Sequence, residues 1–181
     1  MADPTGPGYE ILRGVVPPEG VDRVLRRLHL DIVRNGLGAE DVGRWIWAAH
    51  WFPHLKWDDE ILSVLEYLPD RLRSGQQCDA QILLQPPDEA EEVELVPHVD
   101  TVPDWADGRP YLRIVGVALS PAHERNGGLL VWPFDGEGPV ALTLEPGDVV
   151  VMDPQLPHTS GLNREGAMRY AVYFRFLRPS H

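Results

Sequence analysis

Residues 147–174 read GDVVVMDPQLPHTSGLNREGAMRYAVYF, the segment of the chain that most clearly indicates its fold. Two apolar runs, at 149–152 and 169–177, are rich in Val, Tyr and Phe, and segments rich in Gly, Pro, Asp and Asn surround them. β-branched and aromatic residues in short runs, separated by turn formers, are typical of antiparallel strands.

The same texture extends back to about residue 76, with further strands expected at 81–85, 93–96, 112–119, 129–132 and 140–144. The chain has 18 Pro and 17 Gly in 181 residues, which exceeds the usual ~5% and ~7%. Seven or eight short strands at this spacing predict a β-sandwich or a barrel.

The N-terminal part is expected to begin with a strand over 9–16, followed by a helix in which apolar residues recur every three or four positions from 21 to 33. A second helix is expected over 40–51, and a third from Asp58 or Asp59 to Arg73. We therefore expect one domain over 1–181: a strand and two or three helices over 9–75 brace one sheet of a β core over 76–178.

Composition excludes several classes of protein. The formal net charge of −12 disfavours nucleic acids and anionic membranes as partners, because both are bound through basic surfaces. The single cysteine, Cys78, cannot form an intrachain disulfide or a cysteine metal cage. No signal-like N-terminus and no apolar run of about 20 residues is present, so the expected location is cytoplasmic.

His98-Val99-Asp100 follows a strand-like segment. Residues i and i+2 of a strand project to the same side, so His98 and Asp100 can chelate one metal ion if this segment is extended. His29-Leu30-Asp31 has the same spelling but falls within the first expected helix, where i and i+2 lie about 200° apart. Two histidines and one carboxylate on one face of Fe(II) leave positions open for substrate and oxygen.

His158 supplies the second histidine, and Arg169 follows it by eleven residues within an expected strand. On that strand Arg169 would point inward with Ala171 and Tyr173. A cation inside an apolar barrel is costly unless an anion meets it. A dicarboxylate co-substrate would supply that anion, with Ser160 adding a hydroxyl.

These motifs together resemble those of the Fe(II)/2-oxoglutarate dioxygenases, specifically the phytanoyl-CoA dioxygenase-like family. The resemblance spans about residues 9 to 178, and it is carried by the blocks at 8–28, 81–87, 95–100, 117–133 (VALSPAHERNGGLLVWP) and 147–174. The last block is the most specific, because its His, Ser and Arg fall at the offsets that the family uses. One departure is Phe134-Asp135-Gly136, which stands where the family usually has Gly-Ser-His.

The resemblance implies a mainly β fold, a double-stranded β-helix of the jelly-roll or cupin-like type. It implies that Fe(II) is bound by His98, Asp100 and His158, and that the far carboxylate of 2-oxoglutarate is bound by Arg169 and Ser160. It further implies co-substrate contacts from Gln81 or Gln85, and substrate contacts from Trp105, Arg109, Tyr111 and Arg113.

The implied reaction consumes 2-oxoglutarate and O2, releases succinate and CO2, and oxidises a small molecule, in the simplest case by hydroxylation. The acidic chain favours an amino-acid-like or natural-product substrate over a polyanionic acyl-CoA. Two alternatives stay open at this point: a cupin-like metal-dependent isomerase, and a non-catalytic barrel that binds a small molecule.

Overall fold

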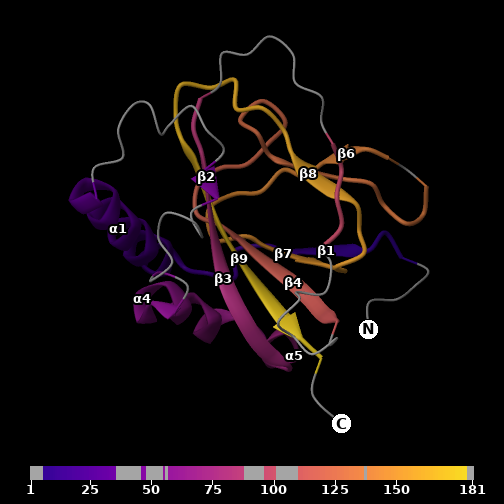
Figure 1. The fold of residues 1–181 in the computed structure, drawn as a ribbon, viewed down its shortest axis with the longest axis horizontal. Coiled ribbons are helices and arrows are strands. Elements are labelled where there is room, and N and C mark those ends of the chain that lie inside the picture. The colour runs from indigo at the N-terminus through magenta and orange to yellow at the C-terminus, as the bar shows by residue number, and fades with distance from the viewer. Residues whose placement is uncertain are drawn as a thin grey trace.

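The computed structural model describes residues 6–35, 46–47, 55, 57–87, 96–100, 110–136 and 138–178. Within them the chain is mainly β and forms two antiparallel sheets (Figure 1). The larger sheet has the order β1 (Tyr9–Leu12), β7 (Val149–Met152), β4 (Tyr111–Ala118), β9 (Arg169–Leu177), β3 (Gln76–Gln85) and β2 (Ile46–Trp47). The smaller sheet has the order β6 (Val140–Ala141), β5 (Leu129–Val131) and β8 (His158–Ser160). The expected mainly β class is confirmed.

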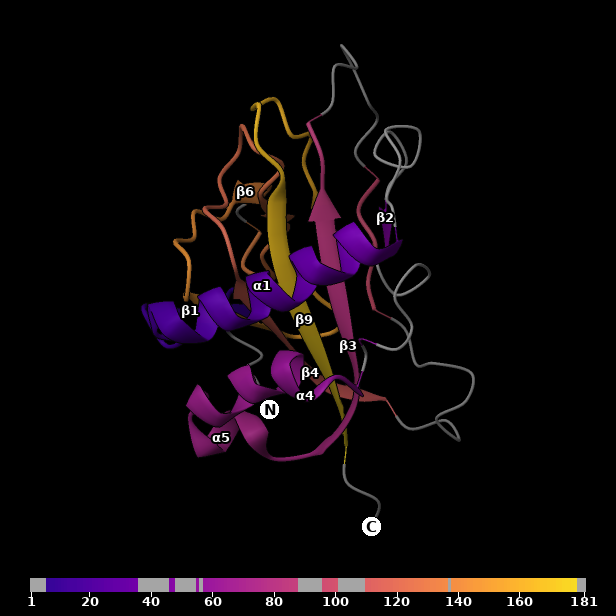
Figure 2. The ribbon, with the colours of Figure 1, turned by 90° about the vertical axis from the view of Figure 1, so that its left-hand side faces the viewer.

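Helices cover one face of the larger sheet. Figure 2 shows α1 (Pro18–Asn35) lying across β9 and β3, with α4 (Asp59–Leu62) and α5 (Asp70–Arg73) beside it. Val24 and Leu28 of α1 share a buried cluster with Leu84 of β3 and with Val172 and Phe174 of β9. The helix is therefore held by the apolar stripe that its three- and four-residue spacing predicted.

The opposite face of the larger sheet looks toward the smaller sheet. A second buried cluster joins Ile114 of β4 and Met152 of β7 to Leu129 and Val131 of β5. Because side chains alternate along β9, Arg169, Ala171 and Tyr173 lie on this inner face while Val172 and Phe174 lie on the helix side. The predicted inward direction of Arg169 follows from this alternation.

Two expectations for the N-terminal helices change. Ile46–Trp47 form β2, paired with Leu84 and Leu83, so the helix expected over 40–51 is wrong at these two residues; the remainder of that segment lies outside the described residues. β9 pairs with one edge of β3, and the other edge still has free backbone donors and acceptors. Ile46 and Trp47 are extended because they form hydrogen bonds with that second edge.

The third expected helix is present but broken. Asp58 caps α4 as expected, accepting hydrogen bonds from the backbone N–H groups of Glu60 and Ile61 at 3.0 and 3.3 Å. A 3₁₀ helix, η2 (Ser63–Tyr67), follows, and α5 begins only after Pro69, which has no N–H to continue a helix. None of the described helices is long and apolar enough to cross a membrane.

Three strands are shorter than expected, and of these β5 ends only one residue early, at Val131. The first ends at Leu12, before Gly14 takes a φ of 58°, and β6 covers only Val140–Ala141 of the expected 140–144. Of the strand expected at 93–96, only Val96 is among the described residues.

Candidate metal centre

The structure brings His98, Asp100 and His158 together. His98 and His158 form an isolated antiparallel bridge, in which each backbone N–H donates to the other's carbonyl at 3.0 and 2.9 Å. The two imidazole rings lie with their centroids 4.5 Å apart. One ligand atom from each of the three side chains lies within 4.8 Å of the other two. The pairing of 98 with 158 makes the H-x-D segment locally extended, so His98 and Asp100 share one side.

The ring of His158 is oriented by its own chain. Its Nδ1 lies 2.9 Å from the carbonyl oxygen of Leu156. Because a carbonyl only accepts, Nδ1 is the donor in this contact, which makes Nε2 the nitrogen that the neutral ring can offer to a metal ion. This is the usual way in which a protein fixes the tautomer of a metal-ligating histidine.

His98 lies at the more exposed side of the cluster. Partial burial lowers its pKa, and the neighbouring His158 and Arg175 act in the same direction, although Asp100 opposes them. The neutral imidazole is therefore favoured, which is the form that binds a metal ion.

Asp100 is held by an arginine that the sequence reasoning did not identify. The Nε of Arg175 donates to Asp100 Oδ2 at 3.0 Å, and its Nη2 donates to Gln81 Oε1. Arg175 lies on β9 six residues after Arg169 and on the same face, so strand alternation was the signal that could have found it. The contact orients the Asp100 carboxylate through Oδ2.

Arg169 lies deeper, with 3% of its surface exposed. Its Nε and Nη2 donate to Gln85 Oε1 at 3.2 and 2.7 Å, and Nη2 also donates to Ser160 Oγ at 3.3 Å. Burial lowers the pKa of Arg169, and Tyr173 partly offsets this. Among the residues that the structure describes, no carboxylate pairs with it. Arg169 is thus a buried cation whose described partners are neutral.

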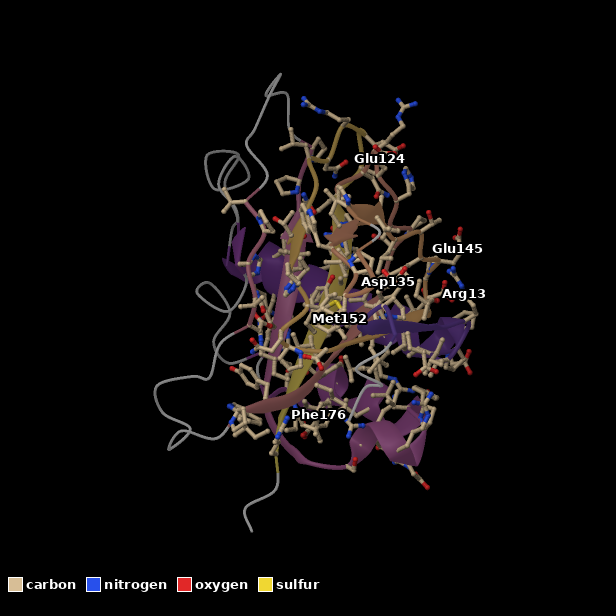
Figure 3. The ribbon with its side chains drawn as sticks, turned by 90° about the vertical axis from the view of Figure 1, so that its right-hand side faces the viewer. Arg13, Glu124, Asp135, Glu145, Met152 and Phe176 are labelled. Carbon is tan, nitrogen blue, oxygen red and sulfur yellow. The ribbon has the colours of Figure 1, made fainter. Side chains whose placement is uncertain are left out.

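A cavity of about 250 Å³ connects the three cluster residues with Ser160, whereas Arg169 and Gln85 lie behind its lining. All three cluster residues line it, together with Gln81, Thr159, Ser160, Tyr173 and Arg175 and the apolar side chains Leu83, Val96, Ile114, Leu129 and Met152. In Figure 3 the labelled Met152 lies in the interior of the molecule, whereas Arg13, Glu124 and Glu145 lie at its periphery. Ser160, the hydroxyl partner of Arg169, therefore faces the same space as the cluster.

Of the remaining expected site residues, Gln81 lines the cavity and Gln85 lies behind it. Gln81 and Gln85 share a face of β3, but they serve different arginines. Tyr111 packs against Leu177, and Arg113 donates to the carbonyl of Arg71 and to Ser74 Oγ, the latter at 3.0 Å. Neither lines this cavity, because the start of β4 lies at the far end of the sheet, beside α5. Trp105 and Arg109 lie outside the described residues.

No protein-family model matches the chain, and no curated protein matches its sequence. Several solved structures do resemble the chain. The non-heme monooxygenase ThoJ, in complex with nickel, is 17% identical, with 97% of this chain and 75% of that chain covered and a TM-score of 0.72.

Two further structures resemble the chain. The non-heme alpha-ketoglutarate-dependent carbocyclase SnoK from nogalamycin biosynthesis is 15% identical, with 94% of this chain and 80% of that chain covered and a TM-score of 0.68. HygX from Streptomyces hygroscopicus, with nickel and 2-oxoglutarate bound, is 16% identical, with 96% and 83% covered and a TM-score of 0.59. At these identities the likeness shows that the chain shares the mainly β, cupin-like fold of these proteins.

Proposed function

We propose that the chain is a non-haem Fe(II)- and 2-oxoglutarate-dependent dioxygenase of the phytanoyl-CoA dioxygenase-like type, built on a double-stranded β-helix. One observation carries the proposal: His98, Asp100 and His158 line a cavity that also contacts Ser160, the partner of a buried arginine without a described countercharge. The metal cluster alone would suit many metalloenzymes. The buried arginine behind Ser160 supports an anionic co-substrate.

The donor set fits Fe(II). Two neutral imidazole nitrogens and one carboxylate oxygen form the facial triad of non-haem iron oxygenases and leave coordination positions open. When bound, iron supplies the oxygen activation and the oxidative decarboxylation that amino-acid side chains cannot perform. The chain's own part is to hold His158 by Leu156 and Asp100 by Arg175, so that these two ligands are oriented before the metal binds.

The buried arginine fits 2-oxoglutarate. A carboxylate that reached Arg169 would form a charge-assisted, two-point hydrogen-bonded pair in a site already shielded from water. Ser160 lies between Arg169 and the cavity and would donate its hydroxyl to the same carboxylate. The keto-acid end of the co-substrate would then extend through the cavity toward the cluster.

The overall reaction balances without a further reductant. 2-Oxoglutarate, O2 and a substrate C–H bond give succinate, CO2 and a C–OH group, so both oxygen atoms of O2 are accounted for. We propose an amino-acid-like or natural-product substrate for a cytoplasmic protein. The apolar lining of the cavity supports a small molecule, and the net charge of −12 opposes binding to nucleic acid or membrane. SnoK is a carbocyclase, so product analysis has to separate hydroxylation from ring closure.

Anaerobic titration tests this function. Fe(II) and 2-oxoglutarate together should give a visible metal-to-ligand charge-transfer band, and O2 should then release succinate. His98→Ala should abolish both, whereas His29→Ala is a matched control, because His29 belongs to an H-x-D triplet within α1. Absence of the band and of succinate in the wild type would rule out the proposal. A band without succinate release would favour the non-catalytic barrel, and turnover of a substrate without 2-oxoglutarate would favour the isomerase.

A further inference from the structure

The guanidinium group of Arg169 has two edges that can each receive two hydrogen-bond acceptor atoms of a carboxylate: the side edge of Nε and Nη2, and the terminal edge of the two Nη atoms. Both donors of the side edge converge on one atom, Gln85 Oε1, at 3.2 and 2.7 Å. The terminal edge, from which Nη2 also donates to Ser160 Oγ at 3.3 Å, is therefore the one that a bound carboxylate can meet, with Tyr173 as a further neutral hydrogen-bond partner of the guanidinium group.

From this arrangement we infer that Gln85 is a positioning residue for the co-substrate, acting through Arg169, and that Gly127 is needed to make room for the Gln85 amide. The inference rests on the proposed function and assigns a different role to Gln85 from direct contact with 2-oxoglutarate. Gln85 occupies the side edge of Arg169, so that only the terminal edge is presented toward Ser160 and the cavity.

Both polar atoms of the Gln85 side-chain amide have a partner: Nε2 donates to the carbonyl oxygen of Gly161, and Oε1 accepts from Arg169. The backbone of Gln85 is held as well, because its carbonyl oxygen accepts from Asn163 Nδ2 at 2.9 Å. A carbonyl only accepts and a guanidinium only donates, so Nε2 must face Gly161 and Oε1 must face Arg169. Gln85 is 4% exposed, so loss of either partner would leave a buried polar atom without a hydrogen bond.

Gly127 leaves the space that this amide occupies. A Cβ atom built at Gly127 would lie 2.4 Å from Nε2, 2.5 Å from Cδ and 2.7 Å from Oε1 of Gln85. These distances are far below van der Waals contact, so any side chain at position 127 would displace the amide and with it the acceptor on Arg169. Gly127 also has a φ of 78°, which favours glycine on its own account.

Gly136 provides a control for that backbone effect. It has a φ of 85°, and a Cβ built there would meet nothing within 4 Å. Gly136→Ala therefore imposes the same kind of backbone strain as Gly127→Ala without touching Gln85 or any other group.

The experiment measures two dissociation constants by isothermal titration calorimetry on the full chain: Ni(II) to the metal-free protein, and 2-oxoglutarate to the Ni(II)-loaded protein. Gln85→Ala and Gly127→Ala should each raise the Kd of 2-oxoglutarate about tenfold or more, because a hydrogen bond to a charged group is lost. The Kd of Ni(II) should stay within about twofold. Gly136→Ala should change neither constant.

A double-mutant cycle isolates the contact. If Gly127 acts through the Gln85 amide, Gly127→Ala in the Gln85→Ala background should cause no further loss of 2-oxoglutarate affinity. Additive losses, or a Gln85→Ala protein that binds 2-oxoglutarate as tightly as the wild type, would overturn the inference while leaving the proposed function intact. A wild-type protein that binds Ni(II) but no 2-oxoglutarate would overturn the proposed function itself. Gln85→Ala alone decides the matter if Gly127→Ala fails to fold.

Discussion

Replacing Arg169 with Met separates the fold from the co-substrate. Met has a similar length and no charge, and Arg169 is 3% exposed with neutral described partners. Removing a buried cation recovers its desolvation cost, whereas leaving Gln85 Oε1 without a donor costs about 1–3 kcal/mol. The two changes oppose each other, so we expect Arg169→Met to fold with a stability close to that of the wild type.

The effect on 2-oxoglutarate should be large. Two charge-assisted hydrogen bonds at about 1.5–3 kcal/mol each amount to about 3–6 kcal/mol, which raises Kd by at least about 100-fold. At a ligand concentration of 100 times the wild-type Kd, binding stabilises the wild type by about 2.7 kcal/mol but a 100-fold weaker variant by only about 0.4 kcal/mol. For a domain of this size, the rise in Tm is then about 5–10 °C against about 1 °C.

Thermal unfolding of the Ni(II)-loaded proteins measures this, with two ligands. 2-Oxopentanoate carries a methyl group where 2-oxoglutarate has its far carboxylate, so the wild type should prefer 2-oxoglutarate strongly and Arg169→Met should show little preference. Arg178→Met, at an exposed position just beyond β9, should retain the wild-type preference. If Arg169→Met still distinguished the two ligands as the wild type does, the assignment of Arg169 as the carboxylate receptor would be refuted.

Two further predictions concern stability and can be checked by urea unfolding. Asp148→Ala should destabilise the protein by about 2–4 kcal/mol, because its carboxylate accepts from the backbone N–H groups of Gly14 and Glu145 at 2.8 and 2.9 Å; a loss under 0.5 kcal/mol would contradict this. Burial alone would raise the pKa of Asp148, but these hydrogen bonds and the contact with Arg13 outweigh burial and lower the pKa. The ionised Asp148 carboxylate therefore stabilises the wild type at neutral pH, and this stabilisation is lost as the pH falls below about 4. The pH dependence of Asp148→Asn should therefore be flatter in that range. Phe174→Ala, at a fully buried position on the helix side of β9, should cost about 3–5 kcal/mol without changing the Kd of 2-oxoglutarate.

Local sequence patterns were sufficient wherever one short segment supplies the geometry. Alternation along 169–177 placed Arg169, Ala171 and Tyr173 on one face, and the register of β9 with β3 agrees, pairing Arg169 with Gln85. Apolar spacing located α1, and the capping preference of Asp58 located the start of α4. These features depend on backbone periodicity and on hydrogen bonds between near neighbours, both of which can be read from residue order.

The features that were missed arise from contacts between distant segments. Ile46–Trp47 take a strand because β3 offers an edge, and no local preference indicates that. Gln81 and Gln85 are indistinguishable as two glutamines on one strand face, yet the first lies beside Arg175 and Asp100 and the second lies beside Arg169. Their separation depends on the register of β3 with β9, which places Gln85 opposite Arg169 and Gln81 opposite Tyr173, two residues before Arg175.

Residue order alone thus determines that the chain is mainly β and acidic, that an arginine points inward, and that H-x-D and a distal histidine are available as ligands. Their meeting is a tertiary event: the bridge between His98 and His158 joins segments 60 residues apart in number. The same holds for the fit of the Gln85 amide over Gly127. Hydrogen bonds and excluded volume act only at atomic distances, and only the packed sheets bring these atoms within that range.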